Sequence, residues 1–332
     1  MSTYSQIRGT KILTTDNTFN DGQVIDVSNF EVGQLIINKD DLSLNIIKCS
    51  LNPFWTAGGA MATARYGLAG AGTNTAALAF GGYATAIVAC TESYNGSSWT
   101  AGGSLGTARE NLAGAGASNT AALAFGGIIY PDNLTCTESY NGSTWTAGGA
   151  LSTARDILSG VGTNTAALAF GGYATAIVAC TESYNGTSWT AGGAMATARY
   201  GLAGAGTNTA ALAFGGFDSN FLSLSCTESY NGSTWTAGGA LSTARGVLAG
   251  AGTNTAALAF GGTTTVAVAC TESYNGSTWS AGGAMATARY PAGNGTNTAA
   301  LAFGGIDSNY YQLSCTESYT TNAGKLSVKI RI

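Results

Sequence analysis

Residues 65–100 read RYGLAGAGTNTAALAFGGYATAIVACTESYNGSSWT, and the same order of residues recurs along the chain until six units are present. Tryptophan marks the period, because it occurs only at positions spaced by 44, 46, 44, 46 and 44 residues: Trp55, Trp99, Trp145, Trp189, Trp235 and Trp279. An arginine follows each tryptophan by ten residues, beginning with Arg65 and Arg109. Such a period indicates a repeat architecture, in which each unit buries its apolar faces only against its neighbours.

Each unit predicts four short strands, which we call a to d. In the first unit GLAGAG is strand a, AALAFG is strand b, VACTESY is strand c, and Trp99 lies at the start of strand d. Strand b places Leu78 and Phe80 on one face and alanines on the other. Asn95-Gly96 predicts a tight hairpin between strands c and d, because a type I′ turn needs positive φ at both central residues. Four antiparallel strands at this spacing are typical of a β-propeller blade.

The order Arg65, Gly81-Gly82, Glu92, Tyr94 and Trp99 resembles the kelch repeat, a family of β-propellers, and the resemblance covers residues 55–319. The proline that often precedes the kelch arginine is absent here. The series opens with a lone strand d at Trp55 and ends at Tyr319 without one. Because open sheet edges expose unpaired backbone groups, we expect the Trp55 strand to complete the last blade. The predicted fold is all-β, a six-bladed kelch-like propeller closed by an N-terminal strand.

The two ends differ in composition from the repeats and predict a second module. VGQLIINKDDLSLNIIK (residues 32–48) predicts a hairpin, and KLSVKIRI (325–332) alternates as a strand does. We expect residues 1–54 to form an attachment module and residues 320–332 to pair with it. The run from Gly33 resembles short elements near the N-termini of bacteriophage tail fibres, with Gln34 in place of their glutamate, and YSQIRGTKI (4–12) is similar to fibre openings. The resemblance implies a virion protein assembled in the host cytoplasm, attached to other virion proteins through this module.

Composition excludes several classes of function. Charged residues make up 9% of the chain and the net charge is −4, which gives no electrostatic footprint for nucleic acid. No run of 18 apolar residues predicts a membrane helix, and the N-terminus lacks the apolar core of a secretory signal. The chain contains no histidine and no CxxC, so we expect no metal and no cofactor. Enzymes similar to kelch proteins include galactose oxidase, whose copper ligands include histidines, and we therefore expect a non-enzymatic protein.

Two repeated residue types have both a functional and a structural interpretation. Six cysteines occupy one position in every unit, which predicts free, buried packing thiols spread around the ring rather than disulfides: Cys90, Cys136, Cys180, Cys226, Cys270 and Cys315. Cys49 lies outside the pattern. We expect Glu92 and its equivalents to pair with an arginine, and for Glu92 the partner is either Arg65 or Arg109. Such pairs either line an anion-binding site or anchor strand c. Because every unit has both residues, we favour the anchor.

Variation among the units points to a binding face. The a–b and c–d turns hardly change, whereas the residues after each arginine and the b–c stretch do, and that stretch measures 7, 8, 7, 9, 7 and 9 residues. Since chain direction alternates along a blade, the d–a and b–c connections emerge together. We expect this face to contact a host-surface glycan or protein through Tyr83, Tyr130, Asp132, Tyr173, Phe217, Asp218, Phe221, Asp307, Tyr310 and Tyr311. The alternative explanation of the variation is that nothing constrains the loops. The alternative functions are a purely structural virion decoration protein, a cellular kelch adaptor and an enzyme. Each of these is compatible with a homo-oligomer.

Overall fold

The computed structural model describes residues 12–14, 35–37, 43–48, 53–321 and 326–331, and every regular element in them is a β-strand. The chain divides into two compact units, Met1–Asn52 with Thr321–Ile332 and Pro53–Thr320. The described residues contain no helix long and apolar enough to cross a membrane.

The larger unit consists of six four-stranded antiparallel sheets. In chain order, the first three blades contain β5 (Ala69–Gly72), β6 (Ala77–Phe80), β7 (Thr91–Tyr94) and β8 (Trp99–Ala101); β9 (Ala113–Ser118), β10 (Ala121–Phe125), β13 (Thr137–Tyr140) and β14 (Trp145–Ala147); and β15 (Ser159–Gly162), β16 (Ala167–Phe170), β17 (Thr181–Tyr184) and β18 (Trp189–Gly192). The next two contain β19 (Ala203–Gly206), β20 (Ala211–Phe214), β21 (Thr227–Tyr230) and β22 (Trp235–Gly238); and β23 (Ala249–Gly252), β24 (Ala257–Phe260), β25 (Thr271–Tyr274) and β26 (Trp279–Ala281). A two-stranded hairpin, β11 (Ile128–Ile129) and β12 (Asp132–Asn133), sits in the second b–c loop.

The sixth blade is built from both ends of the repeat region. It contains β27 (Ala292–Gly295), β28 (Ala299–Phe303), β29 (Thr316–Thr320) and, as its outer strand, β4 (Phe54–Gly58). Trp55 pairs with Tyr319 in the antiparallel register of β4 and β29. Each innermost strand contacts the innermost strand of the next blade along the chain, and β27 of the last blade contacts β5 of the first. The structure is therefore a closed six-bladed β-propeller, and the predicted closure by the N-terminal strand is confirmed.

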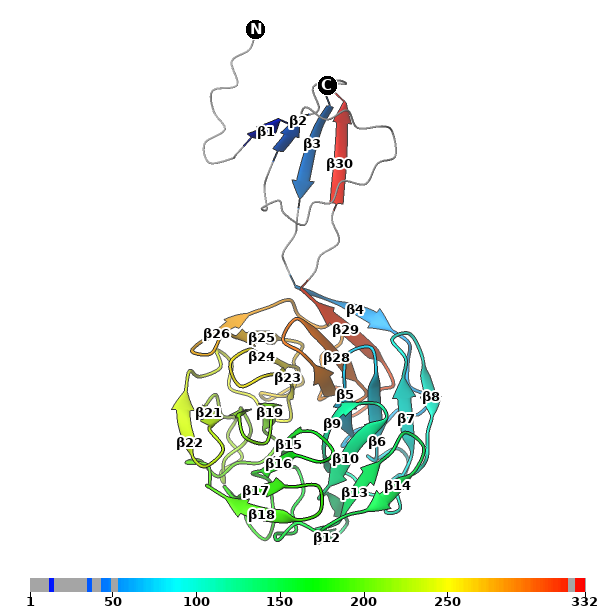
Figure 1. Cartoon of the computed structure of the whole chain (residues 1–332), viewed down its shortest axis with the longest axis vertical. Helices are drawn as coiled ribbons and strands as arrows, with labels where there is room; N and C mark the ends of the chain where they lie inside the picture. The colour runs from blue at the N-terminus through cyan, green and yellow to red at the C-terminus, as the bar shows by residue number, and fades with distance from the viewer. Residues whose placement is uncertain (1–11, 15–34, 38–42, 49–52, 322–325, 332) are drawn as a thin grey trace. The chain divides into compact units, whose positions relative to one another are not determined.

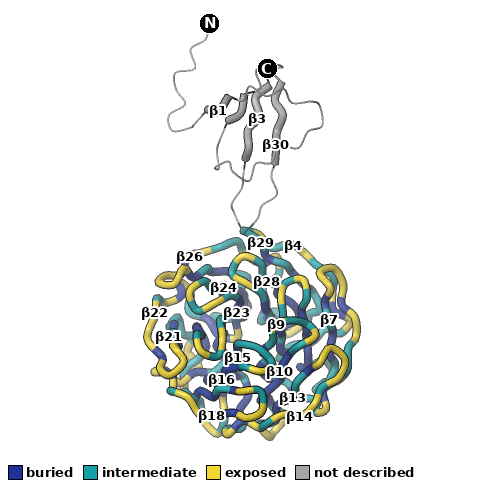
Figure 2. The backbone as a smooth tube through the Cα atoms, viewed as in Figure 1, coloured by how far each residue is buried: buried dark blue, intermediate teal, exposed yellow. Residues whose placement is uncertain are grey.

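Strand a lies nearest the centre of the ring and strand d at its rim, as Figure 1 shows for β5, β9, β15, β19 and β23 against β8, β14, β18, β22 and β26. Blades crowd together at the centre, and the inner strands there are built of alanine and glycine, with Ser118, Ser159, Val161 and Asn294 as exceptions. Burial is greatest in strand b, whose Ala-Leu-Ala-Phe residues are fully buried in every blade, whereas loops at the rim are exposed (Figure 2).

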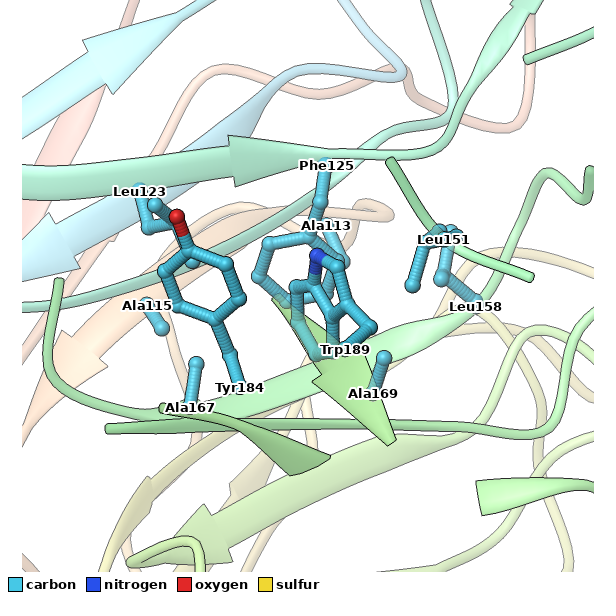
Figure 3. Packing of buried hydrophobic residues seen from close by; sticks show 10 residues of the cluster. All are labelled: Ala113, Ala115, Leu123, Phe125, Leu151, Leu158, Ala167, Ala169, Tyr184 and Trp189. Carbon is cyan, nitrogen blue, oxygen red and sulfur yellow. The ribbon is translucent and has the colours of Figure 1, made fainter. Parts of the chain in front are cut away.

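The same packing occurs at all six junctions between blades. The Leu–Phe face of one strand b packs on the Ala–Ala face of the next, as Leu123 and Phe125 pack on Ala167 and Ala169 beside Trp189 (Figure 3). At the closing junction Leu301 and Phe303 meet Ala77 and Ala79 in the same way. A large face on a small face fills the wedge between sheets without voids, which is why strand b alternates in residue size.

Each tryptophan also ties its blade to the preceding one by a hydrogen bond. The Trp145 Nε1–H donates to Thr91 Oγ1 at 3.0 Å, and the bond recurs around the ring at 2.9–3.0 Å. It closes the circle, since Trp99 donates to Thr316 and Trp55 donates to Thr271. A buried indole thus packs as an apolar group and satisfies its only donor.

The smaller unit contains one four-stranded sheet in the order β1 (Ile12–Thr14), β2 (Leu35–Ile37), β3 (Ser43–Lys48) and β30 (Leu326–Arg331). The β1–β2 pair is parallel, whereas β3 is antiparallel to both β2 and β30. Residues 38–42, which connect the two strands of the predicted 32–48 hairpin, and Cys49 lie outside the described residues.

Candidate binding face

The d–a and b–c connections lie side by side on one face of the propeller, which we call the variable face. Isolated antiparallel bridges join them, including Tyr66 to Tyr83 and Tyr200 to Phe217. The second and third blades have the same arrangement, with Glu110 joined to Ile128 and Asp156 to Tyr173. The segments that vary most between repeats therefore share one surface, as the alternation of strand direction predicted.

Large hydrophobic side chains are exposed almost exclusively on this face. Of the ten such residues among those described, nine belong to d–a or b–c connections: Ile129, Tyr130, Tyr173, Phe221, Leu222, Val247, Val266, Tyr310 and Tyr311. The tenth is Phe54 at the rim. The most exposed are Tyr130 at 82%, Tyr310 at 80% and Phe221 at 75%. Tertiary packing thus leaves apolar surface uncovered on one side of the ring only.

The predicted binding residues divide into an exposed and a supporting group. Tyr130, Asp132, Tyr173, Phe221, Tyr310 and Tyr311 are exposed, whereas Tyr83, Phe217, Asp218 and Asp307 are half-buried. Tyr83 packs against Tyr66 with ring centroids 5.5 Å apart, and Phe217 packs against Tyr200 at 5.4 Å. Tyr83 and Phe217 therefore support the face rather than project from it. The prediction missed Leu222, which is 62% exposed but follows Phe221 without any distinguishing pattern.

Long b–c loops alternate with short ones around the ring, and each long loop is fastened to a short neighbour. The Asn133 Nδ2 group donates to the backbone carbonyls of Tyr173 and Ala174. The Gln312 Nε2 group donates to Ala84 O at 2.7 Å, which joins the sixth blade to the first. These bonds limit the freedom of the loops that present the exposed aromatic rings.

All unpaired charge of the propeller lies on the variable face. Within residues 53–321 the only cations are six arginines, each fully buried in an ion pair with a glutamate of strand c. The carboxylates left over are those of Glu110, Asp132, Asp156, Asp218 and Asp307. All five belong to d–a or b–c connections, so this face is acidic and the opposite face is uncharged.

Two of these carboxyl groups are perturbed by burial. Burial raises the pKa of Asp156 from 3.8 to about 6, although a hydrogen bond with the Asn111 side chain opposes the rise. Burial also raises the pKa of Glu110, with a further contribution from the charge of Asp156. In contrast, the backbone N–H of Leu222 lowers the pKa of the Asp218 carboxyl.

The d–a connections also form a hydrogen-bonded collar around the centre of the variable face. The N–H of Asn111 donates to Gly67 O, and that of Ile157 donates to Asn111 O. Gly201 and Val247 continue the series, with N···O distances between 2.6 and 3.0 Å. All five residues have positive φ, between 48° and 61°. The sixth blade has Pro291 in a connection one residue shorter, so the collar is open there.

The axis of the ring inside this collar is lined by strand a. Two hollows of about 160 and 110 Å³ lie along it, and they share the glycines at the middle of each strand, such as Gly70 and Gly114. Asn294 stands where other strands have alanine or valine, and its Nδ2 donates to Ala71 O at 2.6 Å. The lining consists of backbone groups, small side chains and, in the larger hollow, leucines and Pro291, and it contains no charged side chain.

The arginine–glutamate pairs are anchors inside each blade. Glu92 pairs with Arg65 at 2.7 Å, which settles the partner in favour of the arginine of the same repeat rather than Arg109. The Glu92 carboxylate also accepts the backbone N–H of Ala62 at 2.6 Å, and equivalent bonds recur in the other blades. Each pair therefore fastens strand c to the connection that leads into strand a, and it does not face solvent.

The six repeat cysteines are free, as predicted, but they are half-buried rather than buried. The sulfur atoms of Cys90, Cys136, Cys180 and Cys226 accept hydrogen bonds from the arginine guanidinium groups, as in Arg65 Nη1–H to Cys90 Sγ at 2.9 Å. The thiols lie at the edge of the buried ion pair, which keeps one side of each accessible. The described residues contain no group of three or more histidine, cysteine or carboxylate side chains able to hold a metal ion.

Comparisons with known proteins do not extend this description. A scan against protein-family models finds no matching family, and a search of curated proteins finds no significant match.

Proposed function

We propose that this protein is a non-enzymatic binding protein of a virion appendage, and that its variable face contacts a glycan on the host surface. The observation that carries the proposal is the concentration of exposed aromatic side chains on one face of a rigid ring, while the opposite face is nearly uniform. Rigid scaffolds that present variable loops are a common way to build binding sites.

The mixture of groups on the face favours carbohydrate over protein. Exposed tyrosine and phenylalanine rings offer flat apolar surfaces beside the acceptor oxygens of Asp132, Asp218 and Asp307. Sugars present C–H faces and hydroxyl donors, which match this combination. A protein surface is the second candidate, and the experiment below separates the two.

The virion context rests on the resemblance of residues 4–12 and 32–48 to tail-fibre elements. In this proposal the unit of Met1–Asn52 and Thr321–Ile332 attaches to other virion proteins. Detection of the chain in purified particles by mass spectrometry supports this context, whereas its recovery only among cellular proteins contradicts it.

The binding proposal is tested with fluorescently labelled protein on a panel of bacterial strains. A triple variant, Tyr130→Ala with Phe221→Ala and Tyr311→Ala, is expected to lose cell binding and keep its melting temperature, because all three side chains are exposed. The matched control changes three exposed threonines on the opposite face, Thr75→Ala, Thr165→Ala and Thr255→Ala, and is expected to bind normally.

Treatment of the cells identifies the class of ligand. Periodate oxidation of the cells abolishes binding to a glycan, whereas protease treatment abolishes binding to a protein. Unchanged binding by the triple variant would overturn the proposal and leave a purely structural role.

A further inference from the structure

Two loops of the variable face have the same sequence pattern and the same conformation. Residues 218–222 read DSNFL and residues 307–311 read DSNYY, in the b–c loops of the fourth and sixth blades. In the first, Asp218 Oδ1 accepts the N–H groups of Asn220 and Leu222 at 2.8 and 2.9 Å. In the second, Asp307 Oδ1 accepts those of Asn309 and Tyr311, both at 2.9 Å.

The backbone closes each loop in the same way. The Asp218 N–H donates to Leu222 O and the Phe221 N–H donates to Asp218 O, both at 3.1 Å. The equivalent bonds of Asp307 with Tyr311 and Tyr310 have the same lengths. Four shared hydrogen bonds make the two loops copies of one structural device.

Each copy holds an exposed aromatic residue in an unfavourable backbone conformation. Phe221 has φ of 61° and Tyr310 has φ of 62°, while their side chains are 75% and 80% exposed. Bulky residues rarely adopt this backbone conformation, and such strain is concentrated at binding sites. Burial of the ring does not compensate for the unfavourable backbone conformation in either residue, so we infer that this conformation serves to orient the rings outward.

Both loops are also hydrogen-bonded to neighbouring short loops, those of the fifth and first blades. The Ala267 N–H donates to Ser308 Oγ at 2.9 Å, and Gln312 Nε2 donates to Ala84 O. Ser223 donates to Thr264 O at 3.5 Å. Ordering the loops before the ligand arrives reduces the entropy lost on binding.

The charges of the face restrict the ligand. No cation of residues 53–321 reaches the surface, and an aspartate stands at the base of each loop. A phosphate, sulfate or carboxylate on the ligand would meet like charge without a counter-charge. One oxygen of each aspartate is committed to backbone N–H groups, and its other oxygen, Oδ2, takes no part in those bonds.

The spacing of the loops favours small ligand units over a protein. The short loop of the fifth blade separates the two, so the exposed aromatic rings stand in two groups, with the exposed aliphatic side chain of Val266 on the loop between them. Protein interfaces instead have one contiguous, well-packed apolar core.

On the basis of the proposed function, we propose that residues 218–222 and 307–311 are two matched subsites, each for one uncharged sugar residue of a repeating polysaccharide. The ring of Phe221 or Tyr310 stacks on the apolar face of the sugar, and the Oδ2 atom of Asp218 or Asp307 accepts a hydrogen bond from a sugar hydroxyl group. The third long loop, residues 128–135, has a different conformation with β11 and β12 and does not belong to the matched pair.

The first test is a glycan array that carries neutral and acidic oligosaccharides, probed with the full chain. Binding is expected among the neutral glycans, with little change between about 0.1 and about 1 M NaCl, because no ion pair with the ligand is involved. Preferential binding of acidic glycans would overturn the proposed ligand class, as would loss of binding at the higher salt concentration.

The second test uses the polysaccharide of the best array ligand in biolayer interferometry. Phe221→Ala and Tyr310→Ala are each expected to weaken polysaccharide binding by about 10-fold or more, because each removes one of two linked contacts. The double variant is expected to abolish it, while Phe221→Tyr and Tyr310→Phe retain it. Melting temperatures verify that every variant is folded.

The outcomes separate this proposal from the proposed function. If the double variant binds normally but Tyr130→Ala does not, the variable face still binds glycans and the matched subsites are wrong. If the native chain binds no glycan while its binding to cells is sensitive to protease, the glycan ligand is wrong in both proposals.

Discussion

Trp55 and Tyr319 lie opposite each other in neighbouring strands of one blade, with ring centroids 5.1 Å apart, although almost the whole propeller separates them in sequence. Trp55 also packs on Phe260 of the fifth blade at 5.0 Å and donates to Thr271 Oγ1. This one side chain therefore contributes both to the closing blade and to its junction with the preceding blade.

Replacement of Trp55 by alanine is expected to destabilise the propeller by about 3 kcal/mol, the lower end of the range for a buried aromatic residue, because Trp55 is half-buried. Trp189→Ala, at the equivalent position of a blade that is continuous in sequence, is the matched comparison. Chemical denaturation measures both. A Trp55→Ala variant as stable as the native chain would show that β4 is dispensable for closure.

The buried ion pairs predict a strong asymmetry between single and double substitutions. Arg65→Met leaves Glu92 buried beside backbone donors without its counter-charge, and is expected to cost about 3–5 kcal/mol. Arg65→Met with Glu92→Gln removes both charges and keeps an acceptor for Ala62 N–H, so it is expected to cost less than the single change. Urea denaturation of these two variants and of Glu92→Gln alone completes the double-mutant cycle. Additive costs would contradict coupling between the two residues.

One pair gives a further sign of this coupling. Burial opposes ionisation of Glu272, yet the Ser242 N–H and the Arg245 guanidinium lower the pKa of this carboxyl below its ordinary value. A lowered pKa contributes stability above the ordinary pKa of a glutamate, and this contribution is lost as the pH falls through the folded-state value. Acid unfolding of the native chain is therefore expected to be steeper than that of Glu272→Gln.

Asp156 predicts the opposite dependence on pH. Its pKa is about 6 in the folded chain against 3.8 ordinarily, so the folded state binds more protons between these values. The contribution of this group to stability is then most favourable below pH 4, falls as the pH rises to about 6, and becomes constant at higher pH, where the carboxyl is ionised in both states. Asp156→Asn is expected to be more stable than the native chain at pH 7 by on the order of 1 kcal/mol. Melting temperatures between pH 4 and pH 8 measure this, and an equal difference at every pH would contradict it.

The repeat cysteines are expected to remain reduced and to react slowly. Burial raises the pKa of the Cys90, Cys136 and Cys180 thiols, which lowers the fraction of reactive thiolate at neutral pH. Labelling with Ellman's reagent should be several-fold slower in the native protein than in denaturant, and the melting temperature should not change with a reducing agent. A melting temperature that falls on reduction would indicate disulfides.

The sequence indicates the positive φ of some collar residues but not of others. Gly67 and Gly201 stand at equivalent positions of two repeats, which is the pattern expected where φ is positive, and Asn111 is the next most tolerant residue there. Ile157 and Val247 occupy the same position with the same φ sign against their intrinsic preference. Their conformation is imposed by the neighbouring connections that bond to them, so no local reading of residues 155–158 predicts it.

The sequence by itself determined the number of blades, the four strands of each and the closure by the Trp55 strand, because a propeller repeats one local pattern whose periods are written in the residues. Only the tertiary structure decided which arginine pairs with Glu92, how far the thiols are covered, and that loops 217–225 and 306–314 share one turn. The ion pair and the thiol contact join strand c to the connection that leads into strand a, so they are set by how the strands of one blade pack. The shared turn depends on hydrogen bonds from backbone N–H groups to the Asp218 and Asp307 carboxylates, and the residue types alone do not fix that backbone geometry.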